Sequence, residues 1–187
     1  MSLVELRAVA CVRGGRRLFE GLDLVLEPGG AALVTGPNGA GKSSLIRIAA
    51  GLLAPSAGTV ERTARAALAD EGLALDPRLA LGRALGFWSG LDGADAAEAM
   101  MAMGVSALAD VPVRMLSTGQ RKRAALARVM AGGALLWLLD EPANGLDGDG
   151  QARLEAAMAA HRGAGGAILA ASHQPIGLPG AASVTLG

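Results

Sequence analysis

The chain has 187 residues, of which 51% are hydrophobic and 18% are charged, and its formal net charge is zero. This composition suits one folded domain and excludes intrinsic disorder, while the balanced charge argues against a general nucleic-acid binder. The lone Cys11 excludes a disulfide scaffold, the apolar run 129–139 is too short to span a membrane, and the N-terminal segment lacks a secretory pattern, so we expect a soluble, intracellular protein.

Apolar patterns and turn residues divide the chain into alternating strands and helices. We predict strands over 3–11, 18–26 and 31–35, a helix over 43–53, one or two short strands within 59–69, a helix-like segment over 77–113, a helix over 120–130, a strand over 134–139, a helix over 152–161 and a strand over 167–171. The segments 163–166 and 177–182 are interpreted as turns. The alternation indicates an α/β fold with a mainly parallel sheet.

The strongest motif is a glycine-rich loop between the strand predicted at 31–35 and the helix predicted at 43–53. It reads Gly36-Pro37-Asn38-Gly39-Ala40-Gly41-Lys42-Ser43 and matches the pattern G-x-x-x-x-G-K-[ST]. Its backbone N–H groups and the helix N-terminus suit a phosphate. Lys42, one of only two lysines, should reach the terminal phosphates, and the Ser43 hydroxyl should ligate Mg²⁺. The alternative is a helix-capping turn that arose by chance.

Two carboxylates follow the apolar strand predicted at 134–139. Ligands of open α/β sheets bind at the carboxyl ends of the strands, where Asp140 and Glu141 stand. We predict that Asp140 holds Mg²⁺ and that Glu141 polarises an attacking water. Acidic residues are common in turns after strands, so the pair alone is a moderate signal. It indicates a metal and catalytic site because the glycine-rich loop is also present.

A third motif, Leu116-Ser117-Thr118-Gly119-Gln120, opens the helix predicted at 120–130. Ser117 and Gln120 are spaced as a capping box, which is the structural alternative to a functional role. The two interpretations are compatible, because a helix N-terminus with free N–H groups also attracts a phosphate.

Together these motifs, followed by Asn144-Gly145-Leu146-Asp147 and the isolated His173, resemble an ATP-binding-cassette (ABC) ATPase across nearly the whole chain. Segment 50–60 also fits that family. The length, Phe87-Trp88, segments 116–129 and 135–147, and 172–175 are similar to the ATP-binding subunit of bacterial cytochrome c maturation (haem exporter) complexes, the CcmA family. The resemblance implies a P-loop fold with one domain over 1–187, an N-terminal antiparallel β part and a small helical subdomain at about 77–116.

The resemblance also implies roles for individual residues. Two copies would form a homodimer that sandwiches two ATP molecules, each held by the loop of one copy and by the signature motif of the other. The loop residues are Gly36, Pro37, Asn38, Gly39, Ala40, Gly41, Lys42, Ser43 and Ser44, and the signature residues are Ser117, Thr118, Gly119 and Gln120. His173 would contact the γ-phosphate beside Glu141, and Asp147 would couple the two sites. A lone, structurally satisfied histidine is the alternative for His173.

Two positions depart from the wider family. The chain has no tyrosine, and the aromatic residue that stacks on adenine is replaced by Arg13, whose guanidinium can stack on a base. Phe19 is interpreted as core. No glutamine occurs between Lys42 and Gln120, where the family carries one beside Mg²⁺; Asp70-Glu71 stands near that place. Our hypothesis is that Glu71 ligates Mg²⁺ instead, and the alternative is that the contact is lost and turnover is slow.

The implied function is ATP hydrolysis that drives haem release or export through multi-span membrane subunits, similar to CcmB and CcmC, from the cytoplasmic face of a bacterial inner membrane. Alternatives are a soluble ATP-gated clamp on ribosomes or DNA, another small-substrate exporter, or a non-hydrolysing scaffold. The neutral charge disfavours the clamp, and so does the absence of basic arms. His161 matches no motif and is interpreted as a solvated residue at a helix end.

Overall fold

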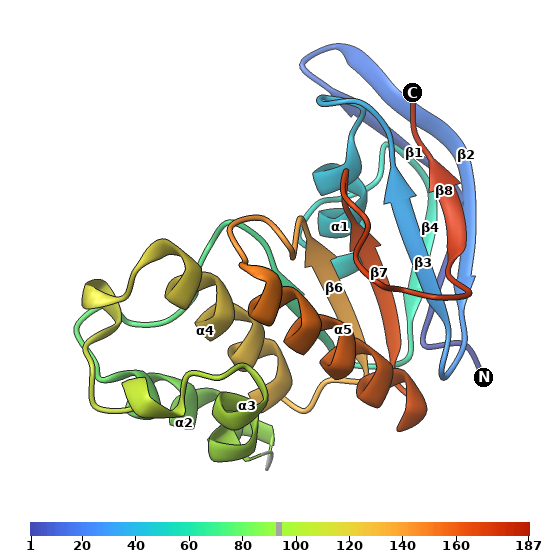
Figure 1. Cartoon of the computed structure of the whole chain (residues 1–187). Helices are drawn as coiled ribbons and strands as arrows, with labels where there is room; N and C mark the ends of the chain where they lie inside the picture. Colours follow the sequence, from blue (N-terminus) through green and yellow to red (C-terminus); the bar gives the residue numbers. More distant parts are fainter. Residues whose placement is uncertain (93–94) are drawn as a thin grey trace.

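A computed structural model describes residues 1–92 and 95–187 of the chain, and its strands form two sheets (Figure 1). The antiparallel sheet has the order β2-β1-β4 and is built from β1 (Val4–Arg13), β2 (Arg16–Leu26) and β4 (Ala57–Arg62). The five-stranded parallel sheet has the order β5-β6-β7-β3-β8. Its strands are β5 (Ala66–Ala69), β6 (Leu136–Asp140), β7 (Ala167–Ala171), β3 (Ala31–Thr35) and β8 (Ala182–Thr185).

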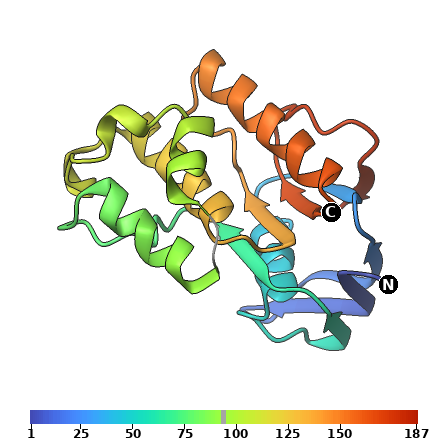
Figure 2. The same ribbon diagram turned by 90° about the horizontal axis from the view of Figure 1, so that it is seen from below.

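The central strands are apolar throughout because both faces of the parallel sheet are covered. In β6, Leu136 and Leu138 belong to the core between the two sheets, together with Leu45 and Ile46 of α1 (Lys42–Ala50). Trp137 and Leu139 point to the opposite core, which is filled by the other helices. Figure 2 shows α1 between the antiparallel sheet and the parallel strands, with α5 on the far side of the parallel sheet.

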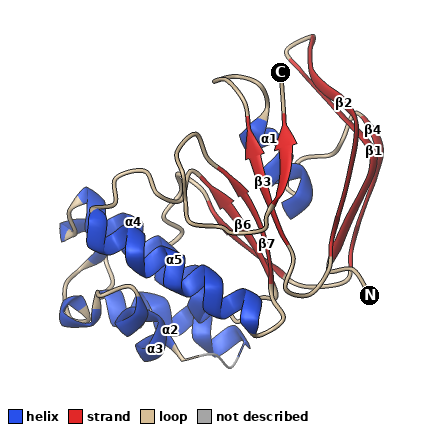
Figure 3. Cartoon of the chain, turned by 45° about the vertical axis from the view of Figure 1, so that its right-hand side comes forward, coloured by secondary structure: helices blue, strands red, loops and turns tan. Residues whose placement is uncertain are grey.

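The remaining helices extend the molecule away from the sheets. α5 (Gly148–Gly163) contacts β7, whereas α2 (Leu81–Asp92), α3 (Ala96–Ala102) and α4 (Thr118–Ala131) pack against one another (Figure 3). Short 3-10 turns at Ser106–Leu108 and Val113–Met115 lead into α4. Among the described residues, the helices include none that is both long and apolar enough to cross a membrane.

The sequence predicted most elements and missed one strand. β3 and β7 have the predicted bounds, and the predicted α/β class with a mainly parallel sheet is confirmed. β8 was not predicted, because its four residues are mostly exposed and it lies at the sheet edge. The helix-like segment 77–113 contains α2, α3 and a 3-10 turn, with Gly104 at a φ of 64° shortly after α3.

Candidate nucleotide-binding site

The predicted motifs meet where neighbouring parallel strands end. β3 leads into the glycine-rich loop, β6 ends at Asp140 beside Glu141, and β7 is followed by Ser172 and His173. β7 lies between β6 and β3 in the sheet, and all three run in the same direction. Residues more than a hundred positions apart therefore share one edge, which is where ligands of open α/β sheets bind.

The loop depends on glycine at two crowded positions. Gly36 has a φ of 143°, and a Cβ atom there would lie 2.3 Å from the backbone oxygen of Leu186. Gly41 has a φ of 104°, and a Cβ atom there would lie 3.0 Å from Leu18 and 3.1 Å from the Phe19 ring. Leu186 near the C-terminus and Leu18 and Phe19 of β2 therefore leave little room for a side chain at these two loop positions. Phe19 is buried, as predicted.

Lys42 and the start of α1 supply the positive charge of the site. The Lys42 side chain is 8% exposed, and its Nζ donates to the carbonyl oxygens of Gly36 at 2.8 Å and Pro37 at 3.2 Å. Gly41 is the N-cap of α1 without a side-chain hydrogen bond, and the first turn contains no acidic residue. The first N–H groups of the helix therefore have no side-chain cap that would compete with an anion.

A cavity of about 350 Å³ opens over this loop. Ser43 and Ser44 line it together with Arg13 from the end of β1 and Glu141 from the end of β6. The structure thus brings Arg13, which lies 29 residues before Lys42 in the chain, to the loop.

Asp140 has the features of a candidate cation ligand. Its side chain is 7% exposed, and its Oδ1 atom is buried without a hydrogen-bond partner among the described residues. Burial raises the pKa of Asp140, and a hydrogen bond from Ser43 acts in the opposite direction. An orphaned carboxylate oxygen beside a serine hydroxyl is the donor set that Mg²⁺ prefers, so these two residues fit the expected metal.

Glu141 and His173 form a pair at the mouth of the site. His173 Nδ1 lies 2.8 Å from Glu141 Oε2, and the Glu141 backbone N–H donates to the Ala171 carbonyl oxygen at 2.8 Å. Glu141 has a φ of 47°, which is uncommon for a residue with a side chain and costs about 1–3 kcal/mol. The strand end is therefore held in a conformation that aims this carboxylate toward His173.

The signature motif begins α4 as a complete capping box. Ser117 Oγ accepts from the Gln120 N–H at 3.3 Å, and the Ser117 N–H donates to Gln120 Oε1 at 2.9 Å, as the spacing predicted. Within the part of the chain that the structure describes, the lining of the loop cavity includes none of the residues 117–120. Asp147 is the N-cap of α5, where its Oδ1 accepts from the Gly150 N–H at 2.8 Å.

Glu71, the candidate substitute for the missing glutamine, lies at a second cavity of about 680 Å³. Glu71 is exposed and lines this cavity with Asp70, Thr118 and Lys122. The carboxylates of Asp140, Glu141, Asp70 and Glu71 all interact electrostatically with Lys122. Sequence reasoning missed Lys122, although the scarcity of lysine that marked Lys42 marks it equally.

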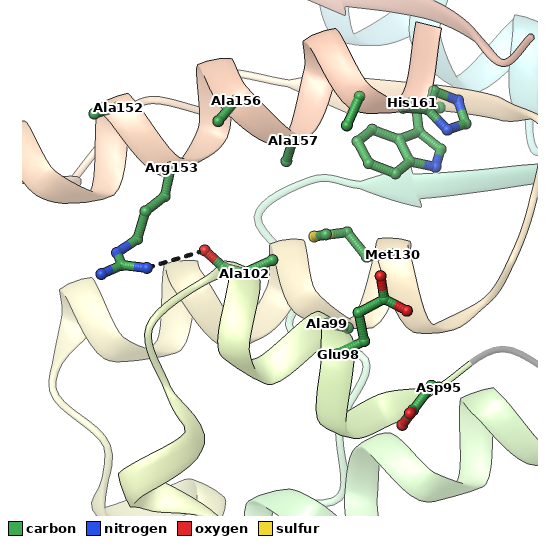
Figure 4. A pocket seen from close by; sticks show the side chains of 12 residues that line it. Asp95, Glu98, Ala99, Ala102, Met130, Ala152, Arg153, Ala156, Ala157 and His161 are labelled. Carbon is green, nitrogen blue, oxygen red and sulfur yellow. Dashed lines mark hydrogen bonds between the residues drawn. The ribbon is translucent and has the colours of Figure 1, made fainter. Parts of the chain in front are cut away.

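Another cavity, of about 860 Å³, lies elsewhere, between α3 and α5 (Figure 4). Its lining is rich in alanine and includes the carboxylates of Asp95 and Glu98, and its Arg153 is paired with Asp149. At one end His161 stacks on Trp137, with the ring centroids 3.9 Å apart. The interpretation of His161 as a solvated residue is wrong: burial lowers its pKa, and its Nε2 lies 3.2 Å from the Leu135 carbonyl oxygen.

A parallel sheet with a glycine-rich loop after β3 and two adjacent carboxylates at the end of β6 defines a P-loop ATPase. Residues 19–144 match the ABC transporter family. A solved structure of the ATP-binding subunit of an ABC transporter has the same fold, with a TM-score of 0.82 and 22% identity over 92% of this chain and 80% of that chain.

Two curated relatives carry the same name. The "Cytochrome c biogenesis ATP-binding export protein CcmA" of Sphingopyxis alaskensis is 56% identical over 99% of this chain and 97% of its own length. The protein of that name from Novosphingobium aromaticivorans is 58% identical over 91% of this chain and 88% of its own. The chain therefore belongs to the ABC transporter family, among the CcmA ATP-binding export proteins. It is a transporter ATPase that binds and hydrolyses ATP.

Proposed function

We propose that this chain is the energy-coupling ATPase of a cytochrome c biogenesis complex and that it drives haem release or export through membrane subunits similar to CcmB and CcmC. The observation that carries the proposal is 56% identity over 99% of the chain with a protein of cytochrome c biogenesis. The chain would work at the cytoplasmic face of the bacterial inner membrane. Motion would pass to these partners through the helical segment at about 77–113, which contains α2 and α3.

ATP would be held by the glycine-rich loop of one copy and the signature motif of a second copy. The uncapped start of α1 and the buried Lys42 support phosphate binding by the loop. The start of α4 supports the second contact: its Ser117–Gln120 box orders a helix N-terminus that does not line the loop cavity of its own copy. Arg13 would stack on adenine, and Asp147 at the start of α5 would couple the two sites.

Ser43 and Asp140 would hold Mg²⁺, with Glu71 as a further candidate ligand. Bound Mg²⁺ would neutralise charge on the phosphates and polarise the γ-phosphate. Glu141 would accept the proton of the attacking water, positioned by the strained turn after β6. Glu141 holds His173 at Nδ1, so Nε2 is the ring nitrogen that would turn to the γ-phosphate, and it would exchange its present contact with Gln174 Nε2 at 3.3 Å for that one.

The test is ATP turnover by the purified chain, measured alone and with its detergent-solubilised membrane subunits. We expect stimulation by the cytochrome c assembly subunits and no stimulation by ribosomes or DNA. Stimulation by ribosomes or DNA would instead favour the alternative function as an ATP-gated clamp. Stimulation by the membrane subunits of an unrelated exporter would show that the chain serves another transport system. Mg²⁺-ATP binding without any turnover, alone or with the subunits, would favour the scaffold. The Lys42→Ala variant, which removes the phosphate-binding cation, is the negative control.

A further inference from the structure

The cavity of about 860 Å³ lies between two parts of the molecule, and among the described residues it shares no lining residue with the cavity over the glycine-rich loop. One wall is α3 of the helical part, and the other is α5, which packs on β7 of the parallel sheet. Pockets that hold small molecules measure about 300–1,000 Å³, a range that includes this volume. In Figure 4, Arg153 lies at one end and His161 at the other. A space bounded in this way suits a small molecule better than a long helix.

Most of the lining is apolar. It consists largely of short side chains, which leave the space open: alanines of α3 and α5, with Met130 of α4. The charge of Arg153 is balanced within the chain, because its Nε pairs with Asp149 Oδ2 at 2.7 Å. Its Nη1 also donates to the Ala102 carbonyl oxygen at 3.3 Å. Arg153 therefore ties α5 to the end of α3 and leaves the apolar part of the cavity open to a ligand.

Trp137 of β6 brings an unused hydrogen-bond donor to the cavity. The residue is 6% exposed, and within the described part of the chain its indole Nε1–H has no acceptor. The other tryptophan differs, because Trp88 Nε1 donates to the Ala74 carbonyl oxygen at 3.1 Å. Trp137 Nε1 is not one of the fully covered atoms without a partner, so it opens onto the cavity that the residue lines. A buried indole N–H usually has a partner, so this one is suited to an acceptor on a ligand.

Two carboxylates give the cavity a negative rim. Asp95 and Glu98 are exposed, and neither forms an ion pair among the residues that the structure describes. Asp95 Oδ1 accepts from the Ala97 N–H at 2.7 Å, a contact that leaves the charge unbalanced. In Figure 4 both carboxylates lie toward the end marked by His161. Burial lowers the pKa of His161, so its ring is uncharged at neutral pH and does not balance them.

We propose that this cavity is a second ligand site, which takes a small, flat organic cation that also carries a hydrogen-bond acceptor. The aromatic body of the ligand lies against Trp137 and the alanines, and its acceptor receives the Nε1–H. Its ammonium group faces Asp95 and Glu98, and the indole ring attracts it as well. The same carboxylates repel anions, which separates this class of ligand from ATP. Because the ligand touches α3 and α5 together, it holds the helical part against the ATPase core.

The test observes the indole N–H groups themselves, since the chain has only two tryptophans. The ¹⁵N-labelled protein is titrated with para-methoxyphenethylamine, whose ether oxygen is an acceptor and whose amine is protonated at neutral pH. We expect the NMR signal of Trp137 Nε1–H to move to higher frequency as its hydrogen bond forms, while the Trp88 signal stays in place. Trp88→Phe assigns the two signals. The matched anion, para-methoxyphenylpropionate, should bind at least about tenfold more weakly. Phenethylamine, which lacks the acceptor, should move the Trp137 signal less.

Two alanines of α5 give a matched pair of variants. Ala156 lines the cavity and Ala159 does not, and both are exposed, so the fold tolerates a leucine at either position. Ala156→Leu should abolish the shift because its side chain fills the space, whereas Ala159→Leu should bind as the wild type does. Glu98→Gln combined with Asp95→Asn, which keeps an acceptor at the N-cap of α3, should weaken binding by about tenfold.

An unmoved Trp137 signal would overturn the proposal, as would equal binding of the cation and the anion or full binding by Ala156→Leu. Thermal unfolding checks that each variant folds, and Ala152→Leu, at another exposed lining position, replaces Ala156→Leu if that variant does not fold. The titration is repeated with saturating Mg²⁺-ATP: an unchanged affinity for the amine supports a separate site, and competition would refute it. The readout requires neither ATP turnover nor membrane subunits, so it is independent of the proposed function.

Discussion

Replacement of Ser117 separates its structural role from its proposed role at the nucleotide. Ser117→Ala removes a capping interaction with a hydrogen bond of 3.3 Å from the Gln120 N–H, which costs about 1 kcal/mol of stability. In a domain of this size the melting temperature should fall by about 2–4 °C. Ser117→Asp keeps an acceptor at the N-cap and adds a charge that favours a helix N-terminus, so its melting temperature should stay near that of the wild type.

Dimer formation should be impaired more by Ser117→Asp than by Ser117→Ala, although Ser117→Asp is the more stable variant. In the proposed sandwich, the carboxylate of Ser117→Asp would face the γ-phosphate of the second copy. At about 4 Å and an effective dielectric constant of about 20, one such pair of like charges costs about 4 kcal/mol. The proposed homodimer contains two such pairs, so together they cost about 8 kcal/mol, which corresponds to about a millionfold loss in dimer affinity.

The assay is size-exclusion chromatography with light scattering at saturating Mg²⁺-ATP, in the Glu141→Gln background that should preserve bound ATP. Ser106→Asp adds the same charge at an exposed residue of the helical part and serves as the matched control. We expect the control to dimerise and Ser117→Asp to remain monomeric with nucleotide bound. A dimer of Ser117→Asp as stable as that of the control would refute the contact between the signature motif and ATP.

Three further predictions follow from single residues. Glu141→Gln should lower turnover by about 10²- to 10⁴-fold with little change in stability, because the side chain keeps its shape and its contact with His173 but loses its basicity. A loss of less than about tenfold in steady-state kinetics would contradict this prediction. Gly36→Ala should abolish ATP binding in calorimetry, because its Cβ would meet Leu186, whereas Gly86→Ala, with nothing within 4 Å, should bind normally. Burial lowers the pKa of His161 from its ordinary 6.5, so on acidification the unfolded chain takes up a proton before the folded chain does. The stability that His161 contributes above pH 6.5 is therefore lost as the pH falls through its folded pKa. In urea unfolding this loss should be smaller for His161→Phe than for the wild type.

The part of the site that is local in sequence could be predicted from it. The loop 36–43 lies directly between β3 and α1, and the box of Ser117 and Gln120 spans a single helical turn, so neighbouring residues determine both. Arg13 is different. The family resemblance pointed to it, but only the pairing of β1 and β2 brings it to the cavity over the loop.

His161 shows why local patterns failed elsewhere. It lies in the last turn of α5, where a polar residue is normally solvated, yet it packs on Trp137 of β6. A helical pattern gives the face of a residue on its own helix, but not the residue of a distant strand that will cover it. β8 was missed for a related reason, because its parallel pairing with β3 depends on residues about 150 positions away.

The sequence by itself determined the order of the strands and helices, the glycine-rich loop, the strand that ends in Asp140 and Glu141, and the capping box. Each of these depends on residues a few positions apart, where backbone geometry and hydrogen bonding are local. Only the tertiary structure decided that Glu141 meets His173, that Asp140 keeps a buried oxygen without a partner among the described residues, and that Lys122 lines a cavity together with Asp70 and Glu71. These contacts arise because the sheet places β7 between β3 and β6 and packs α4 against β5, an arrangement that is set by burial of the whole core.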